Sequence, residues 1–244
     1  MKAIIFNSGL GNRMGDFTNN HHKSMSPVTH GESIFHRQLR LLSAEGVRDV
    51  IVTTGPFEEQ LKAEAAKFPE IRFTFVRNDI YDKTNYIYSM FLAREYINDD
   101  MLFLHGDLVF NRRLLRDVLA SSDPNTATVN FKKALPEKDF KGRVVDGKVV
   151  EVSIKIFDDN CFAFQPMYKL DKATASAWVG KVVEFIHKGE DKCYAENALN
   201  EIFPALNIRP FSYENYYIDE IDNLEDHARV TAEIVAFDEE DADM

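Results

Sequence analysis

The stretch "MKAIIFNSGLGNRMGDFTNNHHKS" at residues 1–24 opens the chain and decides how the rest is interpreted. Residues 2–6 are a short apolar run, which is typical of a buried β-strand. A polar loop follows from Asn7 to Ser24 and carries glycines, an arginine, adjacent histidines and a lysine. Glycines let backbone amides approach a phosphate, and cationic side chains balance its charge. The order of strand and loop therefore predicts a phosphate-binding segment ahead of the first helix.

Two common phosphate-binding motifs do not fit this loop. The dinucleotide motif needs G-x-G-x-x-G, but Gly9 and Gly11 are followed by Gly15 one position late. That motif also needs an acid at the end of the second strand, where the chain has "VTTG" at 52–55. A P-loop needs glycine before its lysine and a helix directly after it, whereas this chain has "HKS" followed by Pro27. Both motifs fail on spacing.

The first half of the chain alternates between predicted strands and helices. We expect strands over 2–6, 49–55, 71–76 and 101–107, and helices over 32–46, 57–68 and 85–97. Such alternation is typical of a parallel sheet with helices on both faces, and ligands bind such sheets at the carboxyl ends of the strands. The expected fold is α/β, with a Rossmann-like, mostly parallel central sheet flanked by helices.

The second half is less regular and predicts a smaller mixed-sheet portion. The sequence "GRVVDGKVVEVSIKI" at 142–156 indicates a hairpin around its Asp-Gly turn. Other strands are expected over 125–131, 160–168 and 209–219, and helices over 110–121, 172–189, 194–203 and from about 223. The acidic end "DEEDADM" is expected to be a solvated tail. Without repeats or a flexible linker, residues 1–244 are expected to form a single domain.

Composition narrows the class of protein further. With 45% hydrophobic and 28% charged residues among 244, the chain should fold as a soluble globule. It has no apolar run near the ~20 residues of a membrane span and no signal-peptide pattern. Its two cysteines, Cys161 and Cys193, lack metal-like spacing, so we expect a reduced, cytoplasmic protein. The net charge of -11 argues against a nucleic-acid partner.

The first loop resembles the opening of nucleotidyltransferases that activate sugars or alcohol phosphates. In these enzymes a strand, G-x-G-x-R, about ten loop residues, a lysine and a helix follow one another. The resemblance implies that Arg13 and Lys23 are catalytic and stabilise charge on the phosphates during transfer. It also implies a nucleotide-binding segment formed by Asn7, Ser8, Gly9, Gly11, Asn12, Arg13 and Lys23. The alternative is an ordinary glycine-rich turn with solvated Arg13 and Lys23.

Three later blocks resemble bacterial choline-phosphate cytidylyltransferases. They are "VRNDIYDKTNYIYSMFLA" at 76–93, "FLHGDLVF" at 103–110 and "YYIDEIDNLEDHARV" at 216–230, which are similar to the family's "ND.Y...NN.YSL.LA", "..DAD.." and "Y.EID...D". Order and spacing agree over essentially the whole chain. The resemblance implies the nucleotide-diphospho-sugar transferase fold and a reaction that couples a nucleoside triphosphate to a phosphorylated acceptor.

The same resemblance assigns further residues to the nucleotide. Asn78, Thr84, Asn85 and Ser89 around the third helix would lie against it, and residues 1–130 would form the nucleotide-binding half. An Asx-rich turn that caps this helix is the alternative. The chain departs from the family where "NSG" replaces "AAG" and where His22 replaces a proline before the lysine. His21 and His22 are more easily explained as loop residues beside phosphate than as metal ligands.

Two aspartates are candidate metal ligands. Asp107 follows a buried strand, and Asp219 follows an aromatic one. Mg²⁺ prefers oxygen ligands, commonly one or two carboxylates together with phosphate oxygens. We therefore expect Asp107, which is also a candidate catalytic residue, and Asp219 to hold Mg²⁺ on the α-phosphate. The alternatives are a turn or cap role for Asp107 and a strand end for Asp219, which has Glu220 and Asp222 as rivals.

Residues 131–244 are expected to bind the acceptor. This half is rich in aromatic and acidic residues, which suit a cation. The candidate acceptor-binding residues are Phe164, Tyr194, Glu196 and Tyr217, although packing in the core is the alternative for each. The resemblance to choline-phosphate cytidylyltransferases implies CTP as the nucleotide donor. The same resemblance, together with these side chains, favours an amine-bearing phosphate or phosphonate, such as choline phosphate, as the acceptor. A sugar 1-phosphate nucleotidyltransferase and an inactive nucleotide-sensing module remain open, as do the base and the oligomeric state.

Overall fold

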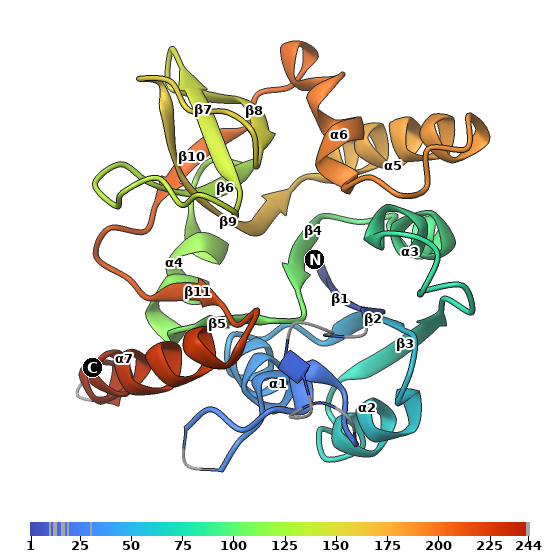
Figure 1. Ribbon diagram of the computed structural model, residues 1–244, viewed down its shortest axis with the longest axis vertical. Coiled ribbons are helices and arrows are strands. Elements are labelled where there is room, and N and C mark those ends of the chain that lie inside the picture. Colours follow the sequence, from blue (N-terminus) through green and yellow to red (C-terminus); the bar gives the residue numbers. More distant parts are fainter. Residues whose placement is uncertain (10, 12–13, 16–17, 19, 30, 243–244) are drawn as a thin grey trace.

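The computed structural model describes residues 1–242 apart from Leu10, Asn12, Arg13, Asp16, Phe17, Asn19 and His30. Its centre is a parallel sheet built from the first half of the chain (Figure 1). The strands are β1 (Lys2–Asn7), β2 (Asp49–Thr54), β3 (Arg72–Arg77) and β4 (Met101–His105). Strand β1 pairs in parallel with both β2 and β4, and β2 pairs in parallel with β3. Their carboxyl ends therefore meet at one edge.

Most strands of the second half extend this sheet. Strand β9 (Cys161–Leu170) runs antiparallel to β4, and β6 (Thr126–Asn130) and β10 (Arg209–Ser212) follow it. The hairpin of β7 (Lys141–Val145) and β8 (Lys148–Ser153) joins through β9. A small antiparallel sheet pairs β11 (Ile218–Glu220) with β5 (Leu108–Phe110). The expected α/β class is confirmed, with the mixed portion continuous with the parallel one.

The expected hairpin turn has the geometry that its sequence indicates. Asp146 and Gly147 have φ of 50° and 70°, the left-handed values that a two-residue type I′ turn requires. Asp146 tolerates this conformation because a short polar side chain is less hindered there than a branched one. The turn fixes how β7 and β8 leave the sheet, and the opposite ends of these strands lead to the cavity described below.

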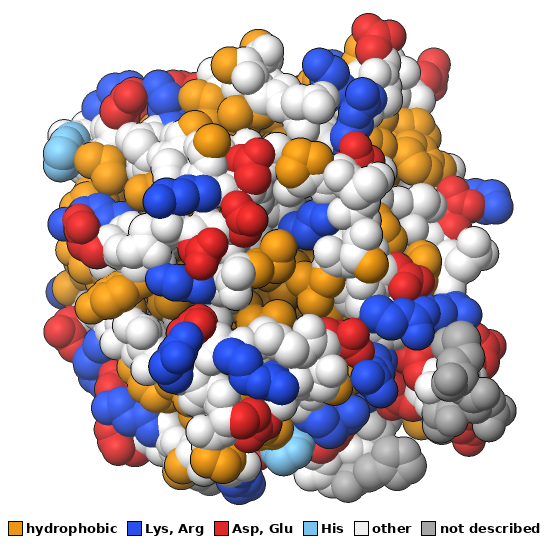
Figure 2. All heavy atoms as spheres, turned by 180° about the vertical axis from the view of Figure 1, so that it is seen from behind, with side chains coloured by type: hydrophobic (Ala, Val, Ile, Leu, Met, Phe, Trp, Pro, Cys, Tyr) orange, Lys and Arg blue, Asp and Glu red, His pale blue; other side chains and the backbone are white. Residues whose placement is uncertain are grey.

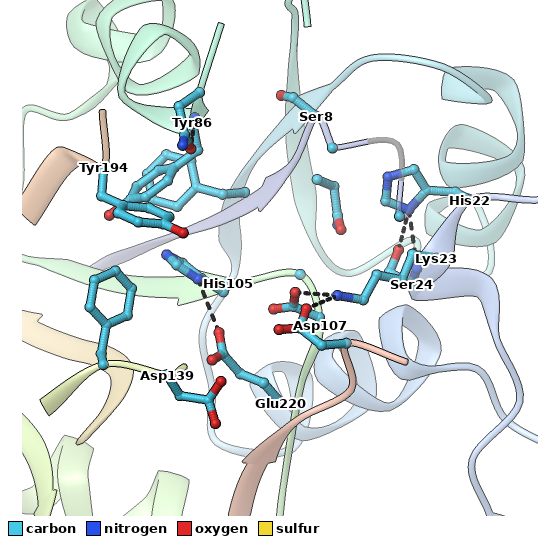
Figure 3. Close-up of a pocket in the computed structure, with 18 of the residues that line it drawn as sticks. Ser8, His22, Lys23, Ser24, Tyr86, His105, Asp107, Asp139, Tyr194 and Glu220 are labelled. Atoms are coloured by element: carbon cyan, nitrogen blue, oxygen red, sulfur yellow. Dashed lines mark hydrogen bonds and ion pairs between the residues drawn. The ribbon is translucent and has the colours of Figure 1, made fainter. Parts of the chain in front are cut away.

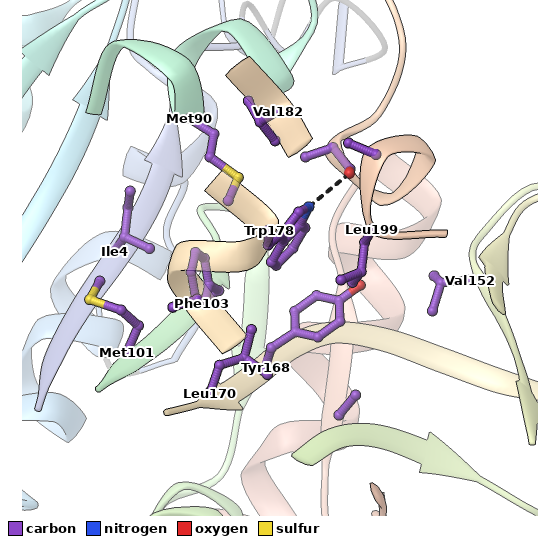
Figure 4. Packing of buried hydrophobic residues seen from close by; sticks show 14 of the residues in the cluster. Ile4, Met90, Met101, Phe103, Val152, Tyr168, Leu170, Trp178, Val182 and Leu199 are labelled. Carbon is purple, nitrogen blue, oxygen red and sulfur yellow. Dashed lines mark hydrogen bonds between the residues drawn. The ribbon is translucent and has the colours of Figure 1, made fainter. Parts of the chain in front are cut away.

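Two hydrophobic layers cover the faces of the sheet. Helices α1 (Ile34–Ala44), α2 (Glu58–Ala65) and α4 (Arg112–Ala120) pack on one face. Helices α3 (Tyr86–Ala93), α5 (Lys172–His187) and α6 (Ala195–Asn200) pack on the other. Trp178 lies at the centre of the second layer against Phe103 and Tyr168, and its Nε1–H donates to the Ala195 carbonyl at 2.9 Å (Figure 4). Its ring is packed in the apolar layer, and its N–H group has a hydrogen-bond acceptor.

The acidic C-terminal segment is not the solvated tail expected from its composition. It continues helix α7 (Leu224–Ala242), which packs beside α4 and β11. Asp238 accepts from Arg37 Nη1 and Nη2 at 2.7 and 2.5 Å, and Asp241 accepts from Asn111 Nδ2 at 3.1 Å. Arg37 is buried, and its Nε and Nη2 also donate to the Phe110 carbonyl at 3.0 and 2.9 Å. The acids are thus structural, because a buried guanidinium requires them.

Charge on the visible surface is mixed. Figure 2 shows acidic and basic side chains interspersed over the rear face, where neither sign gathers into one broad area. Among the described residues, none of the helices is both long and apolar enough to cross a bilayer. Helix α7, although long, is rich in charged residues along its length.

We expect Arg37→Met to destabilise the fold by about 3–5 kcal/mol, because it leaves Asp238, Glu32 and the Phe110 carbonyl without a buried cationic donor. Arg40→Met is the matched control: Arg40 also binds Glu32, but its side chain is 45% exposed, and the change should cost under about 1 kcal/mol. Urea unfolding of both variants measures the difference. Equal losses would show that the buried network adds nothing specific.

Candidate active site

A cavity of about 310 Å³ opens at the carboxyl ends of β1 and β4. In Figure 3, His22, Lys23 and Ser24 lie on one side of it, and Tyr86, Tyr194 and His105 lie on the other. The described residues that line it include Phe6, Asn7, Ser8, Gly9, Gly11, His22, Lys23, Ser24, Asn85, Tyr86, His105, Gly106, Asp107, Lys138, Asp139, Phe140, Ile154, Tyr194, Glu220 and Asp222. The site thus sits where parallel sheets commonly bind ligands.

Lys23 joins the two acidic segments of the site. Its Nζ donates to Asp107 Oδ2 and to Asp222 Oδ1, each at 2.7 Å. Burial lowers the pKa of Lys23, but the two carboxylates outweigh this effect and hold its pKa above the ordinary value. The lysine therefore remains an ammonium ion, which a residue that binds phosphates must be.

The carboxylates around Lys23 fit a divalent cation. Ligand atoms of His105, Asp107 and Glu220 all lie within 4.8 Å of one another. Among the described residues, Asp107 Oδ1 is buried without a hydrogen-bond partner, so one of its oxygens is available. Burial tends to raise the pKa of Asp107, but Lys23 and His105 prevail and lower it, keeping the carboxylate ionised. Burial raises the pKa of Glu220, whose Oε1 lies 3.3 Å from His105 Nδ1.

The structure does not bring Asp219 together with Asp107, which corrects the expected metal pair. Asp219 accepts from Arg229 at 2.6 Å, Lys133 at 3.0 Å and Gln165 at 3.2 Å, and it is not among the described lining residues. Side chains alternate across a strand, so Asp219 faces away from the side to which its neighbour Glu220 points. Glu220 and Asp222, the rivals noted in the sequence, line the cavity instead.

The glycine loop lies against the lysine. Gly11 has φ of +67°, and a Cβ built there would lie 2.8 Å from the Lys23 Cβ, so no other residue fits without displacement. Ser8 Oγ donates to Thr53 Oγ1 at 2.9 Å, which ties the end of β1 to β2. Gly9 also lines the cavity. Asn12 and Arg13, both expected at the nucleotide, lie outside the described residues.

His22 is a buried neutral histidine beside this loop. The Ser24 backbone N–H donates to its Nδ1 at 3.1 Å, which assigns the ring proton to Nε2. Burial lowers the pKa of His22 to about 4, against the opposing influence of the Asn7 and Gly9 carbonyls. Among the described residues, Nε2 has no hydrogen-bond partner. The ring thus offers an N–H group next to the loop without adding a charge.

Asn7 is paired sterically with Gly106. Its side chain is buried, and among the described residues neither its Oδ1 nor its Nδ2 has a hydrogen-bond partner. A Cβ built at Gly106 would lie 1.8 Å from Asn7 Oδ1 and 2.8 Å from the Phe6 carbonyl oxygen. Gly106 is therefore the residue that leaves room for the amide. A buried amide without partners is costly, which suits a group that meets a ligand.

The polar residues predicted around α3 divide into two groups. Asn78 Nδ2 donates to Thr84 Oγ1 and Ser89 Oγ, each at 3.1 Å, and Asn78 Oδ1 accepts from the Ile80 N–H. This is the Asx-rich turn that the sequence left as an alternative, and these three side chains are not among the described lining residues. Asn85 caps α3 by accepting from the Tyr86 N–H and also lines the cavity.

Of the predicted acceptor residues, the structure brings Tyr194 to the cavity. Glu196 lies behind the wall, where it accepts from the hydroxyl groups of Tyr86 and Tyr168. Phe164 is a core residue beside Tyr168, and Tyr217 packs under α7 with its hydroxyl donating to Glu233 at 3.0 Å. These last three were predicted from composition, which does not tell a packed aromatic from a lining one.

Several lining residues were missed in the sequence. Tyr86 and His105, which were not assigned to the site from the sequence, form an aromatic wall together with Phe6 and Phe140. Phe140 also meets Tyr194 with ring centroids 5.0 Å apart. Lys138, Asp139 and Phe140 lie in the irregular segment before β7, where no periodic pattern marks their orientation. The cluster of one basic, one acidic and one aromatic residue in a loop was the signal available.

A parallel α/β sheet with a glycine loop, a lysine and carboxylates at its strand ends has the arrangement of a nucleotidyltransferase. The family described as the MobA-like NTP transferase domain matches residues 3–196. The chain belongs to this family of nucleotidyltransferases, and the expected class of enzyme is confirmed.

Similar proteins include two choline-phosphate cytidylyltransferases. That of Streptococcus pneumoniae is 26% identical over 236 residues, which cover 94% of this chain and 96% of the relative. That of Haemophilus influenzae is 33% identical over 114 residues, or 47% of each chain. The CMP-5'-(3-aminopropyl)phosphonate synthase of Streptomyces rubellomurinus is 28% identical over 160 residues, which cover 65% of this chain. The match spans 25% of the length of this last relative and about half of the Haemophilus enzyme.

Solved structures confirm the fold. The CTP:phosphocholine cytidylyltransferase from Streptococcus pneumoniae superposes with a TM-score of 0.80 at 23% identity, covering 95% of this chain and 97% of that one. The inositol-1-phosphate CTP transferase from T. maritima gives 0.76 at 20% identity, covering 96% and 95%. At these identities the likeness concerns architecture.

We expect Gly106→Ala to destabilise the protein by about 1–3 kcal/mol, because the new methyl group would overlap Asn7 Oδ1. Combining it with Asn7→Ala should recover more than half of this loss, the remainder arising from the Phe6 carbonyl oxygen. Thermal unfolding of the two single variants and the double variant gives the coupling between the positions. Strictly additive effects would contradict a steric pairing.

Proposed function

We propose that this nucleotidyltransferase transfers a cytidylyl group from CTP to a small phosphorylated or phosphonylated acceptor that carries an amine. An acceptor oxygen forms a bond to the α-phosphorus, the bond from that phosphorus to the bridging oxygen breaks, and pyrophosphate leaves. The observation that carries the proposal is the contact of Lys23 with both Asp107 and Asp222 beside the glycine loop. The names of the similar cytidylyltransferases support CTP as the donor.

Charge neutralisation is the main task of this site, since the reaction needs no protein nucleophile. Lys23 supplies a permanent positive charge at the glycine loop, and Arg13 is proposed to do the same. Asp107 and Glu220, whose ligand atoms lie within 4.8 Å of each other, are the oxygen donors that would hold Mg²⁺, and the unpartnered Asp107 Oδ1 fits this role. Asp222, which shares Lys23 with Asp107, is a further proposed donor. The bound ion would supply further neutralisation of the phosphates. The buried His22 and Asn7 would exclude water and face the nucleotide.

The acceptor's cation is proposed to bind between Tyr194, Phe140 and Asp139. Burial raises the pKa of Asp139, and the carboxylates of Asp222, Asp219 and Asp226 raise it further. Negative charge is therefore in excess on this side of the cavity, and a cationic substrate relieves it. The aromatic faces of Phe140 and Tyr194 add attraction of about 0.5–2 kcal/mol per contact. Choline phosphate, an aminoalkyl phosphonate and a phosphorylated amino acid amide all have this chemistry.

Asp107→Asn, Asp222→Asn and Lys23→Met should each lower the rate of pyrophosphate release by at least about 100-fold, because each removes charge from the phosphate site. Asp219→Asn is the matched control, because Asp219 is paired with Arg229 and Lys133. We expect that variant to lose thermal stability but to keep its kcat within a few-fold. A Lys23 or Asp107 variant that is folded and nearly as active as the parent would refute the assignment.

An acceptor panel tests the cationic substrate. With CTP and Mg²⁺, amine-bearing phosphates and phosphonates should release pyrophosphate faster than sugar 1-phosphates do. Asp139→Asn should raise KM for the amine-bearing acceptor about tenfold, or ~1.4 kcal/mol, while the exposed Asp159→Asn should not change it. Faster turnover of sugar phosphates would favour a sugar 1-phosphate nucleotidyltransferase. Nucleotide binding without pyrophosphate release from any acceptor or triphosphate would favour a sensing module.

A further inference from the structure

Two irregular segments contribute residues to the wall of the cavity. Lys138, Asp139 and Phe140 precede β7, and Ile154 follows β8. These segments therefore lie at the open end of one hairpin, opposite its Asp146–Gly147 turn. Residues in loops have few backbone partners of their own, so their positions depend on side-chain contacts.

Lys141 connects the two segments from the inside. Its side chain is fully buried at the start of β7, directly after Phe140. Its Nζ donates to the carbonyl oxygens of Pro136 at 3.0 Å and Glu137 at 3.4 Å on one segment, and of Ile154 at 2.7 Å on the other. One ammonium group thus uses three donors to bind backbone on both sides of the hairpin opening.

The partners of this lysine are unusual for a buried cation. The salt bridges of the described residues do not include one to Lys141, and its charge faces backbone carbonyls and the ring of Phe157, 4.0 Å from Nζ. A buried ammonium needs such partners, because desolvation without them costs several kcal/mol. The same requirement acts on the backbone: the segments must keep their carbonyls directed at Nζ.

We propose that Lys141 is a positioning residue, which fixes the acceptor-side wall by holding residues 136–137 and 154 in one arrangement. It touches no reacting atom, and it acts through Asp139, Phe140 and Ile154, which line the cavity. Only the identity of the ligand that uses this wall rests on the proposed function. The nucleotide side, formed by the first loop and Asp107, does not contact this lysine through any described hydrogen bond or ion pair.

A second buried lysine provides a matched control. Lys169 on β9 is also almost fully buried, and its Nζ donates to the Ser121 carbonyl oxygen at 2.7 Å. It is not among the described residues that line the cavity. Lys141→Met and Lys169→Met therefore make the same chemical change, removing a buried ammonium from backbone carbonyls, at the cavity wall in one case and away from it in the other.

Amide hydrogen exchange of the full chain tests the positioning role directly. Lys141→Met should speed exchange at least tenfold in residues 133–140 and 154–160, whereas Lys169→Met should leave these residues unchanged. Phe157→Leu removes the ring beside Nζ but keeps all three hydrogen bonds of Lys141, so it should increase the exchange rate in the same segments by a smaller factor. This variant replaces Lys141→Met in the experiment if Lys141→Met does not fold. If Lys141→Met folds, unchanged exchange in these residues would overturn the proposal. If Lys141→Met does not fold, unchanged exchange in Phe157→Leu would overturn it.

Kinetics separate positioning from general stability. In pyrophosphate release, Lys141→Met should raise KM for the acceptor about tenfold and leave KM for CTP within twofold, and Lys169→Met should change neither. Equal rises in both KM values would overturn the proposal. If the parent enzyme releases no pyrophosphate with any acceptor, the proposed function fails, while the exchange experiment still decides the role of Lys141.

Discussion

The contact of one ammonium group with two carboxylates holds the candidate site together. Lys23 is separated from Asp107 by 84 positions and from Asp222 by 199, yet its Nζ lies 2.7 Å from both. Three segments that the chain order keeps apart, the first loop, the end of β4 and the segment after β11, therefore meet at one atom. Without Lys23 the two acids would face each other in a buried place, where like charges repel strongly.

A second buried cation, Arg37, stabilises the segments that carry these acidic residues. Arg37 on α1 binds the carbonyl of Phe110 on β5 and Asp238 on α7. Strand β5 pairs with β11, which leads to Asp222, and α7 follows directly. The guanidinium thus secures the segment from which Glu220 and Asp222 reach the cavity. The acidic end of the chain serves the fold because its carboxylates satisfy a cation that could not otherwise be buried.

Acidic side chains outnumber the cationic partners among the residues discussed at the cavity, and this excess of negative charge bears on which ligands the cavity can bind. Lys23 has two acidic partners beside the first loop, Glu220 lies close to Asp107 and His105, and Asp139 also lines the cavity. Burial raises the pKa of both Glu220 and Asp139, so neither is fully compensated within the protein. In the proposed reaction, a metal ion and a cationic acceptor would be favoured there, and the phosphates would lie at Lys23.

The sequence alone determined the fold and placed the first loop and Asp107 at one edge of the sheet, because both depend on local order. Alternating strand and helix patterns require a parallel sheet, and a loop after the first strand must lie at its carboxyl edge beside Asp107. The family motifs indicated the class of enzyme, because their order along the chain can be recognised from the sequence without a structure.

Only the tertiary structure decided which neighbouring residues face the cavity. Asp219 and Asp222 are close in sequence, but strand alternation and the ion pair with Arg229 direct Asp219 away. Phe164 and Tyr194 are equally aromatic, yet one packs in the core and the other lines the wall. The turn around Asn78 depends on its side-chain hydrogen bonds to Thr84 and Ser89. The position of Ile154 depends on the hydrogen bond from Lys141. Such side-chain contacts set the geometry of loops, and no periodic pattern in the sequence records them.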